Sequence, residues 1–346
     1  MMWLSRYDAA MRLFRTFAVL SVICVIGSPR SATLLPVVPE RVAITSTPVS
    51  LQPDDLSRTR AGRLTLVQGW KLASLDSQFG GWSALHVDGD RFTAIGDYGS
   101  VLRFRLTRFG RATEARIDPL PAGCGRVDEK RARDSESLAR VADGWWVGYE
   151  VDDRLCKVTP DFSRGVALRR PAAMADWREQ YGAEAVLQLA DGRFLVFAER
   201  APKGVKLRPL LVFGGDPVDP NTPVSIRSYV PPPGYSPTDA AQLPDGRILV
   251  VNRRFGFTDL FTIMLVVINP AALDSTAPVQ GLPLARLAPP TLHDNFEGLA
   301  VTVENGRPMI WMISDDNFMS WQGTYLLKFA LDLNTKPEPV APAKAN

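Results

Sequence analysis

Acidic residues recur along the 346-residue chain at matching places of a repeated sequence unit. Each unit consists of a polar or acidic residue, a short run of small and apolar residues, an Asp-Gly or Asn-Gly pair, and a second apolar run. The leading residues, which we call the first series, are separated by 53, 48, 55 and 58 positions. They are Ser83, Glu136, Glu184, Asp239 and Glu297. A second polar position follows the second apolar run of each unit. These residues, which we call the second series, are Asp97, Glu150, Glu199, Asn252 and Asp315.

Hard oxygen donors in this number suit Ca²⁺ and, less well, Mg²⁺. We predict that the metal ligands are Asp97, Glu150, Glu199, Asp239 and Asp315. We predict catalytic roles for Glu136, Glu184 and Glu297, because a carboxylate that is not bound to metal can act as a general base. The alternative is structural: these acids cap turns or accept backbone N–H bonds that hold neighbouring repeats together.

Two arginines and one histidine are candidate substrate-binding residues. Arg200 and Arg253 directly follow second-series positions, where they can offset charge or grip an anionic group in a bidentate manner. His293 lies two residues before Asn295 and is expected near the same site, or else is a surface or hydrogen-bonded histidine. The other histidine, His86, is interpreted as structural. The motifs G-x-S-x-G, H-E-x-x-H, G-x-G-x-x-G and the P-loop are absent from the sequence, so the chemistries they serve are unsupported.

The repeat itself predicts the fold. Asp-Gly and Asn-Gly pairs favour tight hairpins, because both central residues of a type I′ turn need positive φ. Units of 48 to 58 residues with several short strands are typical of four-stranded propeller blades. We therefore predict an all-β chain that forms a single β-propeller of five four-stranded blades, with six blades as the alternative. The fifth unit supplies only three strands, and residues 63–67 are expected to add its outer strand and close the ring.

This fold would position the acids. The innermost strand of each blade lines a central channel, and its antiparallel neighbour ends at the mouth where the innermost strand begins. Both acidic series are therefore expected at one mouth of the channel. A short helix is expected over residues 173–181. The following tryptophans are expected to pack between blades: Trp82, Trp145, Trp146, Trp311 and Trp321.

The two ends of the chain differ from the repeats in composition. Residues 1–32 combine early arginines with an apolar run of about 11 residues, which predicts a signal peptide or an uncleaved N-terminal anchor. Residues 33–60 are predicted to be a linker, residues 61–334 the propeller domain, and residues 335–346 a disordered tail. The protein is therefore expected to be exported to the periplasm or secreted, free or anchored to the membrane by its N-terminus.

Cys124 and Cys156 are the only cysteines after the apolar run, and they form either a disulfide or two separate buried thiols. The charge balance of 40 Lys and Arg against 37 Asp and Glu gives a formal net charge of +3. The basic residues are scattered, so nucleic acid is not an expected partner. The sequence does not indicate an oligomeric state.

The segments that carry the acids resemble the phytase-like family described as having esterase-like activity of phytase. The resemblance extends over roughly residues 62–333. It rests on residues 80–85 with 95–99, 134–138 with 148–150, 182–185 with 198–200, and most specifically 294–300 with 313–318 and 322–324. Where the family pattern has glycine after the acid, this chain has Ser137 and Ala185. Asn252 stands where the other units have a carboxylate, which reduces the number of ligands in the fourth unit.

This resemblance implies hydrolysis of an ester or phosphoester. The sequence thus predicts an exported hydrolase that acts on a phosphate or carboxylate ester, with a small-molecule substrate and Ca²⁺ held by the acids at the channel mouth. The alternative is a non-catalytic propeller that binds a ligand or a protein partner on the same face.

Overall fold

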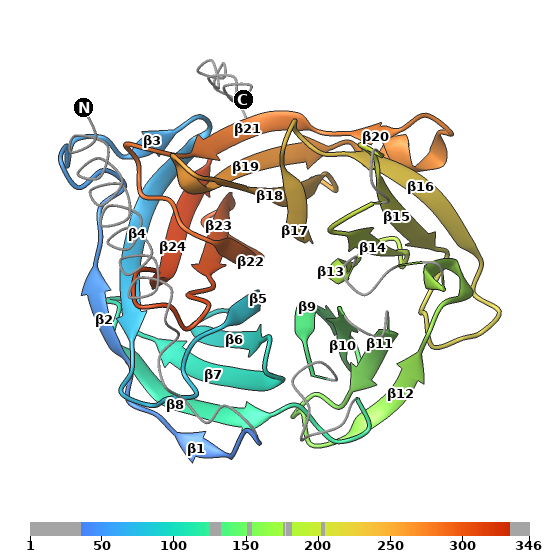
Figure 1. Ribbon diagram of the computed structural model, residues 1–346, viewed down its shortest axis with the longest axis horizontal. Coiled ribbons are helices and arrows are strands. Elements are labelled where there is room, and N and C mark those ends of the chain that lie inside the picture. Colours follow the sequence, from blue (N-terminus) through green and yellow to red (C-terminus); the bar gives the residue numbers. More distant parts are fainter. Residues whose placement is uncertain are drawn as a thin grey trace, which may run out of the picture.

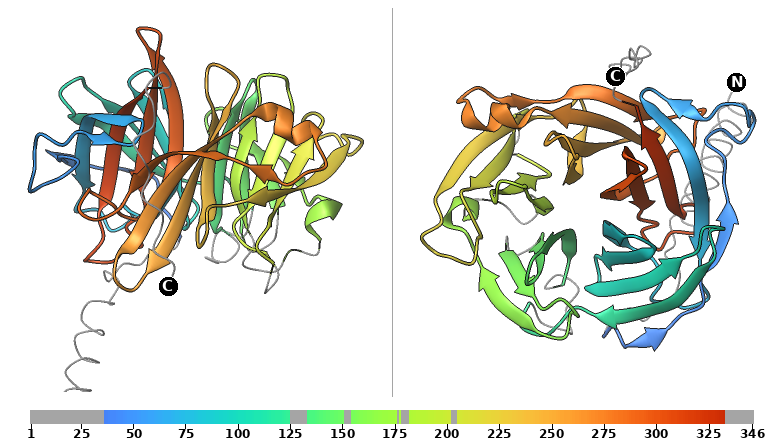
Figure 2. Two further views of the ribbon diagram at one scale, coloured as in Figure 1. Left: turned by 90° about the horizontal axis from the view of Figure 1, so that it is seen from above. Right: turned by 180° about the vertical axis from the view of Figure 1, so that it is seen from behind.

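The computed structural model describes residues 36–124, 133–150, 154–175, 177, 182–201 and 205–332. The predicted signal peptide or anchor and the predicted tail lie outside these residues. Five small antiparallel sheets surround a central axis, and each sheet forms one blade (Figure 1). The side view shows the blades arranged as a thick disc (Figure 2).

Each blade contains four antiparallel strands, which in blades 1 to 4 run from the channel outward in chain order. Blade 1 consists of β5 (Trp82–Asp88), β6 (Arg91–Gly96), β7 (Ser100–Leu106) and β8 (Ala112–Pro119). Blade 2 consists of β9 (Ser135–Val141), β10 (Gly144–Tyr149), β11 (Arg154–Val158) and β12 (Gly165–Arg169). Blade 3 consists of β13 (Ala183–Gln188), β14 (Phe194–Ala198), β15 (Arg208–Phe213) and β16 (Val224–Val230). Blade 4 consists of β17 (Ser236–Gln242), β18 (Ile248–Gly256), β19 (Leu260–Ile268) and β21 (Leu282–Leu287).

Blade 5 joins the two ends of the domain. From the channel outward it consists of β22 (Phe296–Glu304), β23 (Arg307–Ser314), β24 (Thr324–Leu331) and β4 (Leu64–Ala73). The outer strand β4 pairs antiparallel with β24, from Thr324 opposite Leu72 to Leu331 opposite Leu64. The prediction that a strand before the first repeat closes the ring is confirmed, and the number of blades is five.

The described part of the predicted linker, residues 36–60, is more ordered than its composition indicates. Within it, β1 (Glu40–Arg41) pairs with β8 and β2 (Thr45–Pro48) pairs with β4, so the segment extends the outer edges of blades 1 and 5. The short β3 (Arg60–Ala61) also pairs with β4. Val37 and Val42 are buried in the core cluster that blades 1 and 5 share. This segment therefore belongs to the propeller from residue 36 onward.

Little helix accompanies the sheets. Where a short helix was expected over residues 173–181, the structure has the 3-10 helix η2 (Ala172–Met174), and the other described residues of this range, Ala175 and Trp177, are not helical. A second short helix, η3 (Pro270–Asp274), precedes β20 (Val279–Gln280), which pairs in parallel with β16. No helix among the described residues has the length and apolar character needed to span a bilayer.

The hydrophobic core lies between the blades. The innermost strands β5, β9, β13, β17 and β22 contact one another in a closed ring, and aromatic side chains fill the wedges further out. Between blades 1 and 5, Phe92 packs against Trp311 with ring centroids 4.9 Å apart. Four of the five tryptophans expected between blades are buried, whereas Trp321 is 40% exposed.

Cys124 and Cys156 form a disulfide in the structure. It joins the segment after β8 of blade 1 to β11 of blade 2. Of the two arrangements that the sequence left open, the structure has the covalent one.

Candidate functional site

An identical irregularity in all five blades positions the first series of side chains. The pairing between the innermost strand and its neighbour skips one residue of the innermost strand, which is a β-bulge. The skipped residues are Ser83, Glu136, Glu184, Thr238 and Glu297. A bulge leaves its extra residue out of the ladder and re-aims that side chain. Bulges at the same level of five blades therefore direct five side chains to one end of the channel.

The second series follows directly from the same register. The pairs next to the bulge on its mouth side are Trp82 with Gly96, Ser135 with Tyr149, Ala183 with Ala198, Pro237 with Asn252, and Phe296 with Ser314. The next residues on the second strands are therefore Asp97, Glu150, Glu199, Arg253 and Asp315. The backbone N–H groups of Asp97, Glu150 and Asp315 each donate to a carbonyl on their own innermost segment, over 2.9 to 3.0 Å.

The fourth blade corrects two sequence-based assignments. Asp239 and Asn252 were expected at the mouth, but the register places Thr238 and Arg253 there, one residue away in each case. A shift of one residue turns a strand side chain to the opposite face of the sheet. Asp239 is buried, and its carboxylate accepts bonds from the backbone N–H groups of Leu299 (2.6 Å) and Ala240 (2.7 Å). It thus holds blade 4 to blade 5, which is the structural alternative considered for these acids.

Asn252 is also structural. Its side-chain oxygen accepts a bond from the hydroxyl of Tyr229 over 2.8 Å, and its amide donates to the carbonyls of Val250 and Met264. The two mouth series accordingly contain seven carboxylates from four blades, and blade 4 contributes a threonine and an arginine instead. The seven are Asp97, Glu136, Glu150, Glu184, Glu199, Glu297 and Asp315.

Two groups of these carboxylates are close enough to share a cation. Asp134, Glu136 and Glu150 each place one oxygen within 4.8 Å of the others, and so do Glu150, Glu184 and Glu199. Two oxygens bound to one Ca²⁺ at about 2.3–2.6 Å can be at most about 5 Å apart, so both groups have the spacing and the hard donors that this ion prefers. Glu150 belongs to both groups. Predicted ligands Asp97 and Asp315 lie outside them. Burial, and then the nearby Glu297 and Asp97, raise the pKa of Asp315 well above its ordinary value.

Glu184 lies against a glycine that leaves room for it. Gly182 has φ +30°, and a Cβ at this position would lie 2.5 Å from Oε1 of Glu184 and 3.1 Å from Cγ of Glu150. Any residue larger than glycine at position 182 would therefore displace Glu184 or Glu150, which both belong to the group formed with Glu199.

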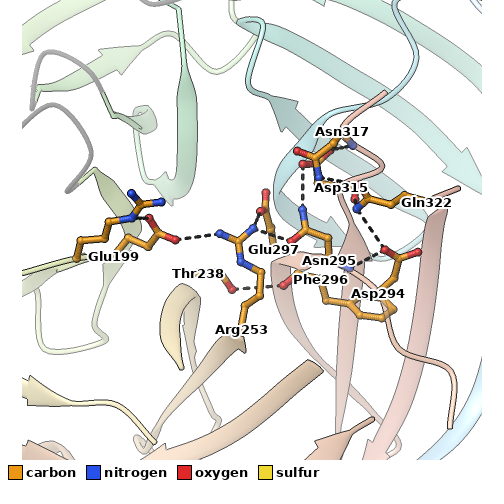
Figure 3. Close-up of polar contacts among 11 residues, drawn as sticks. Glu199, Thr238, Arg253, Asp294, Asn295, Phe296, Glu297, Asp315, Asn317 and Gln322 are labelled. Atoms are coloured by element: carbon orange, nitrogen blue, oxygen red, sulfur yellow. Dashed lines mark hydrogen bonds and ion pairs between the residues drawn. The ribbon is translucent and has the colours of Figure 1, made fainter. Parts of the chain in front are cut away.

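Arg253 lies between two of the glutamates (Figure 3). Its Nη2 donates to Oε1 of Glu199 over 2.9 Å, and its Nη1 donates to Oδ1 of Asn295 over 2.6 Å and to Oε1 of Glu297. Arg200 is half exposed and donates from Nε to Oε2 of Glu199 over 2.8 Å. Both predicted anion-binding arginines thus lie at the site, and in this structure both are paired with protein carboxylates.

The two histidines lie apart from this network. His293 is partly buried, and its Nδ1 donates to the carbonyl of Thr291 over 2.6 Å. His86 packs edge-on against Trp145 with centroids 4.8 Å apart, and burial lowers its pKa. His293 therefore matches the alternative of a hydrogen-bonded histidine, while its role toward a substrate remains a prediction.

Burial and mutual repulsion dominate the electrostatics of the mouth. Burial, and then Glu184 and other nearby carboxylates, raise the pKa of Glu136 well above its ordinary value. Burial and Glu199 raise the pKa of Glu184 well above its ordinary value, although Arg253 opposes the shift. The pKa of Glu297 is also raised by burial, against the opposing effect of Arg253. Within the described part of the chain Glu136 has no hydrogen-bond or ion-pair partner, so this site favours either a bound proton or a cation.

The sequence did not point to Asp134, one of the carboxylates that could hold a cation. Asp134 lies two positions before the bulged Glu136, and its carbonyl accepts the backbone N–H of Glu150 over 3.0 Å. The repeat gave no signal for it, because the other blades have glycine, serine or asparagine at the corresponding place.

Taken together, fold and site define a five-bladed propeller with a strongly acidic channel mouth. Residues 77–318 match the phytase-like family described as "Esterase-like activity of phytase", which is most of the propeller. The chain belongs to this family. No match was found among curated proteins.

Several solved structures are similar in overall form. Glutaminyl cyclase from Myxococcus xanthus aligns with 11% identity and a TM-score of 0.45, over 78% of this chain and 98% of that one. The Malassezia sympodialis allergen Mala s 1 aligns with 13% identity and a TM-score of 0.46, over 83% and 95%. The α-L-arabinanase of Cellvibrio cellulosa, solved with arabinohexaose, aligns with 12% identity and a TM-score of 0.46, over 74% and 93%. Likenesses of this size carry no information on activity.

Proposed function

We propose that the protein is a metal-assisted hydrolase of a phosphate or carboxylate ester, with its reaction centre at the acidic mouth of the channel. The observation that carries this proposal is the convergence of seven carboxylates from four blades, among them Glu136, which has no partner among the described residues. Partly buried carboxylates in such number are unfavourable unless protons or cations compensate them. Membership of a family described by esterase-like activity supports the reaction class.

Five residues would hold a Ca²⁺ ion. They form the two groups of three carboxylates that share Glu150, and they are Asp134, Glu136, Glu150, Glu184 and Glu199. An ion bound there supplies Lewis acidity, which polarises an ester oxygen and lowers the pKa of a bound water. The donor chemistry supports this assignment, because both groups contain carboxylate oxygens alone.

Glu297 is the candidate general base. It lies outside both oxygen groups, its pKa is raised by burial, and Arg253 fixes one of its oxygens. A base whose pKa is closer to neutral is better matched to proton transfer near pH 7. In this proposal Glu297 takes a proton from the attacking water as the oxygen bonds to the ester carbon or phosphorus. The same carboxyl then returns that proton to the departing alcohol oxygen.

The test is hydrolysis of p-nitrophenyl phosphate and p-nitrophenyl acetate with added Ca²⁺ or with EDTA. We expect turnover that EDTA suppresses, and a loss of at least about 100-fold in kcat for Glu297→Gln, the size of a general acid–base contribution. Glu136→Gln, which changes a residue proposed to hold the ion, should raise the Ca²⁺ concentration needed for turnover. The matched control is Asp245→Asn, an exposed turn carboxylate paired with Arg247 at the far end of β17. Thermal unfolding of each variant separates lost chemistry from lost folding.

The opposite result would assign a different function. If neither ester is hydrolysed between pH 5 and 9 with Ca²⁺ present, the hydrolase proposal fails, and the mouth is a binding surface for a ligand or protein partner.

We also propose that the protein acts outside the cytoplasm. The N-terminal sequence pattern and the disulfide between Cys124 and Cys156 support this location, because such bonds persist in oxidising compartments. Fractionation of cells that produce the full chain tests it, and recovery in the cytoplasm with both thiols reduced would overturn it.

A further inference from the structure

Exposed aromatic side chains gather at one edge of the acidic mouth. In the described part of the chain four phenylalanine or tryptophan side chains are exposed, and three of them are Phe255 (55%), Phe257 (98%) and Trp321 (40%). The fourth, Phe109, lies in the turn after β7 at the opposite end of the channel. Exposed aromatic groups that cluster, rather than occur singly, are typical of an interaction site.

These side chains form one contiguous surface with the partly buried Phe261. The ring centroids of Phe255 and Phe257 are 6.0 Å apart, and those of Phe255 and Phe261 are 5.1 Å apart. Phe261 and Trp321 are parallel within 6° at 6.3 Å, which joins the β18–β19 hairpin of blade 4 to the loop between β23 and β24 of blade 5. We call Phe255, Phe257, Phe261 and Trp321 the aromatic rim.

The rim extends beyond the level of the carboxylates because blade 4 has a longer hairpin. In blade 1 the second strand ends at Gly96, directly before Asp97, whereas β18 continues three residues past Arg253 and pairs with β19 as far as Gly256 opposite Leu260. The hairpin, orange in Figure 2, projects on this side of the disc.

The tip of the hairpin is firmly held although its side chains are exposed. Arg254 pairs with Asp259, and Leu260 adopts φ +48°, a left-handed conformation that a leucine rarely adopts. Backbone strain of this kind persists where the surrounding structure enforces it, and it occurs often at ligand sites. The tip thus presents Phe257 to solvent between two residues that are joined by an ion pair, Arg254 and Asp259.

One residue connects the rim to the acids. The guanidinium carbon of Arg253 lies 5.8 Å from the ring centroid of Phe261, while its two terminal nitrogens bond Glu199 and Glu297. The rim and the proposed reaction centre are therefore neighbours within the length of a single side chain. A ligand that contacts both would have a polar end over the carboxylates and a flat apolar end over the aromatic rings.

We propose that the aromatic rim binds an uncharged aromatic group of the substrate, such as the phenyl ring of an aryl ester, while the ester group lies over the carboxylates. The hydrolytic part rests on the function proposed above, whereas binding of the aromatic group does not. An uncharged group fits better than an anionic one, because the carboxylates of the two mouth series outnumber Arg253 and Arg200. Ring-on-ring contacts contribute about 0.5–1.5 kcal/mol each beyond their area, so the rim is expected to favour an aromatic ligand about tenfold.

Binding is tested with two neutral amides, acetanilide and N-methylacetamide, which match phenyl acetate and methyl acetate in shape. Titrations followed by ligand NMR should give a dissociation constant at least about tenfold lower for acetanilide. Trp321→Ala and Phe257→Ala should bring the ratio of the two dissociation constants toward one. Trp321→Phe should retain most of the preference for acetanilide. Phe109→Ala, at a phenylalanine that is 79% exposed at the opposite end of the channel, should leave the ratio unchanged.

Turnover of phenyl acetate and methyl acetate distinguishes the two proposals. A preference in binding without any turnover leaves the rim proposal standing and overturns the hydrolase. Turnover with equal kcat/KM for both esters, together with equal binding of both amides, overturns the rim proposal alone. Binding of the protein to phosphatidylcholine vesicles that Trp321→Ala abolishes, without preference for acetanilide, also overturns it and assigns the rim to a membrane surface.

Discussion

Arg253 of blade 4 donates from Nη2 to Oε1 of Glu199 in blade 3 over 2.9 Å. Its other terminal nitrogen bonds Glu297 in blade 5, so one guanidinium joins three consecutive blades at the mouth of the channel. All three side chains are largely shielded from solvent, with exposed fractions of 20%, 9% and 12% for Arg253, Glu199 and Glu297. The arginine occupies the position that an acid fills in the other four blades, and it reduces the repulsion within the ring.

Replacement of Arg253 should therefore be costly. Removing one partner of a shielded ion pair leaves uncompensated charge, which typically costs about 3–5 kcal/mol. We expect Arg253→Met to lower the free energy of unfolding by about 3 kcal/mol at pH 7.5 in urea titrations. The deficit should shrink toward pH 4, where protonated glutamates no longer need the guanidinium. A deficit that is the same at both pH values would show that Arg253 acts through packing alone.

Glu136 provides a second test of the same electrostatics. Burial and its acidic neighbours raise its pKa above the ordinary value of 4.5. A raised carboxyl pKa contributes stability that is fully present below the unfolded-state pKa and is lost as the pH rises through the folded-state pKa. In EDTA, Glu136→Gln should thus raise the Tm at pH 8 by about 2 °C or more, the shift that roughly 1 kcal/mol produces in a domain of this size.

The same variant should differ little from the wild type near pH 4, where Glu136 itself is protonated. Differential scanning fluorimetry over pH 4–8 measures the trend. A glutamine variant that is less stable than the wild type at pH 8 would contradict the assignment of Glu136 as an uncompensated carboxylate.

Asp239 should behave as a structural residue and not as a metal ligand. Asp239→Ala leaves the buried N–H of Leu299 without its acceptor, and an unsatisfied buried group costs about 1–3 kcal/mol. We expect a lower urea midpoint for this variant and an intermediate one for Asp239→Asn, which keeps one acceptor oxygen. The thermal shift produced by Ca²⁺ should equal that of the wild type, and its loss would return Asp239 to the ligands.

Blade 4 also shows where sequence reasoning reached its limit. The repeat, the hairpin turns and the closing strand follow from residue types and spacing, and the acids of the other four blades were placed correctly at the mouth. In blade 4 the residue type was misleading, because an aspartate stands one position after the bulge that Thr238 occupies. The position of a bulge depends on strand register, which only the pairing with Asn252 and Val251 fixes.

Two other differences between the structure and the predictions from sequence also arise from contacts that the local sequence does not contain. Residues 36–60 have the composition of a linker, but β1 and β2 within them pair with the outer edges of β8 and β4, which local sequence does not reveal. Trp321 was expected to pack between blades because it lies beside a predicted strand, yet it lies on the loop between β23 and β24 and stacks on Phe261 at the surface. Both depend on contacts between segments far apart in the chain.

The disulfide should contribute measurably to stability. It closes a loop with a sequence separation of 32, for which the loss of unfolded-state entropy corresponds to about 3–4 kcal/mol. The double variant Cys124→Ser with Cys156→Ser should have a correspondingly lower free energy of unfolding, and a reducing agent should destabilise the wild type but not this variant. Equal stability of the two proteins under oxidising conditions would show that the bond does not form in solution.

Glu150 is the residue on which cation binding should depend most, because it is the only one shared by the two groups of three carboxylates in the described chain. A ligand at 100 times its dissociation constant stabilises a protein by about 2.7 kcal/mol, which corresponds to a rise in Tm of roughly 5 °C or more. We expect Ca²⁺ to produce such a rise in the wild type, and Glu150→Gln to reduce it to near zero. Asp97→Asn should keep at least half of the rise, because Asp97 belongs to neither group, and Asp245→Asn should keep all of it. If Asp97→Asn abolishes the rise while Glu150→Gln retains it, the cation is held at the blade 1 side of the mouth and not between blades 2 and 3.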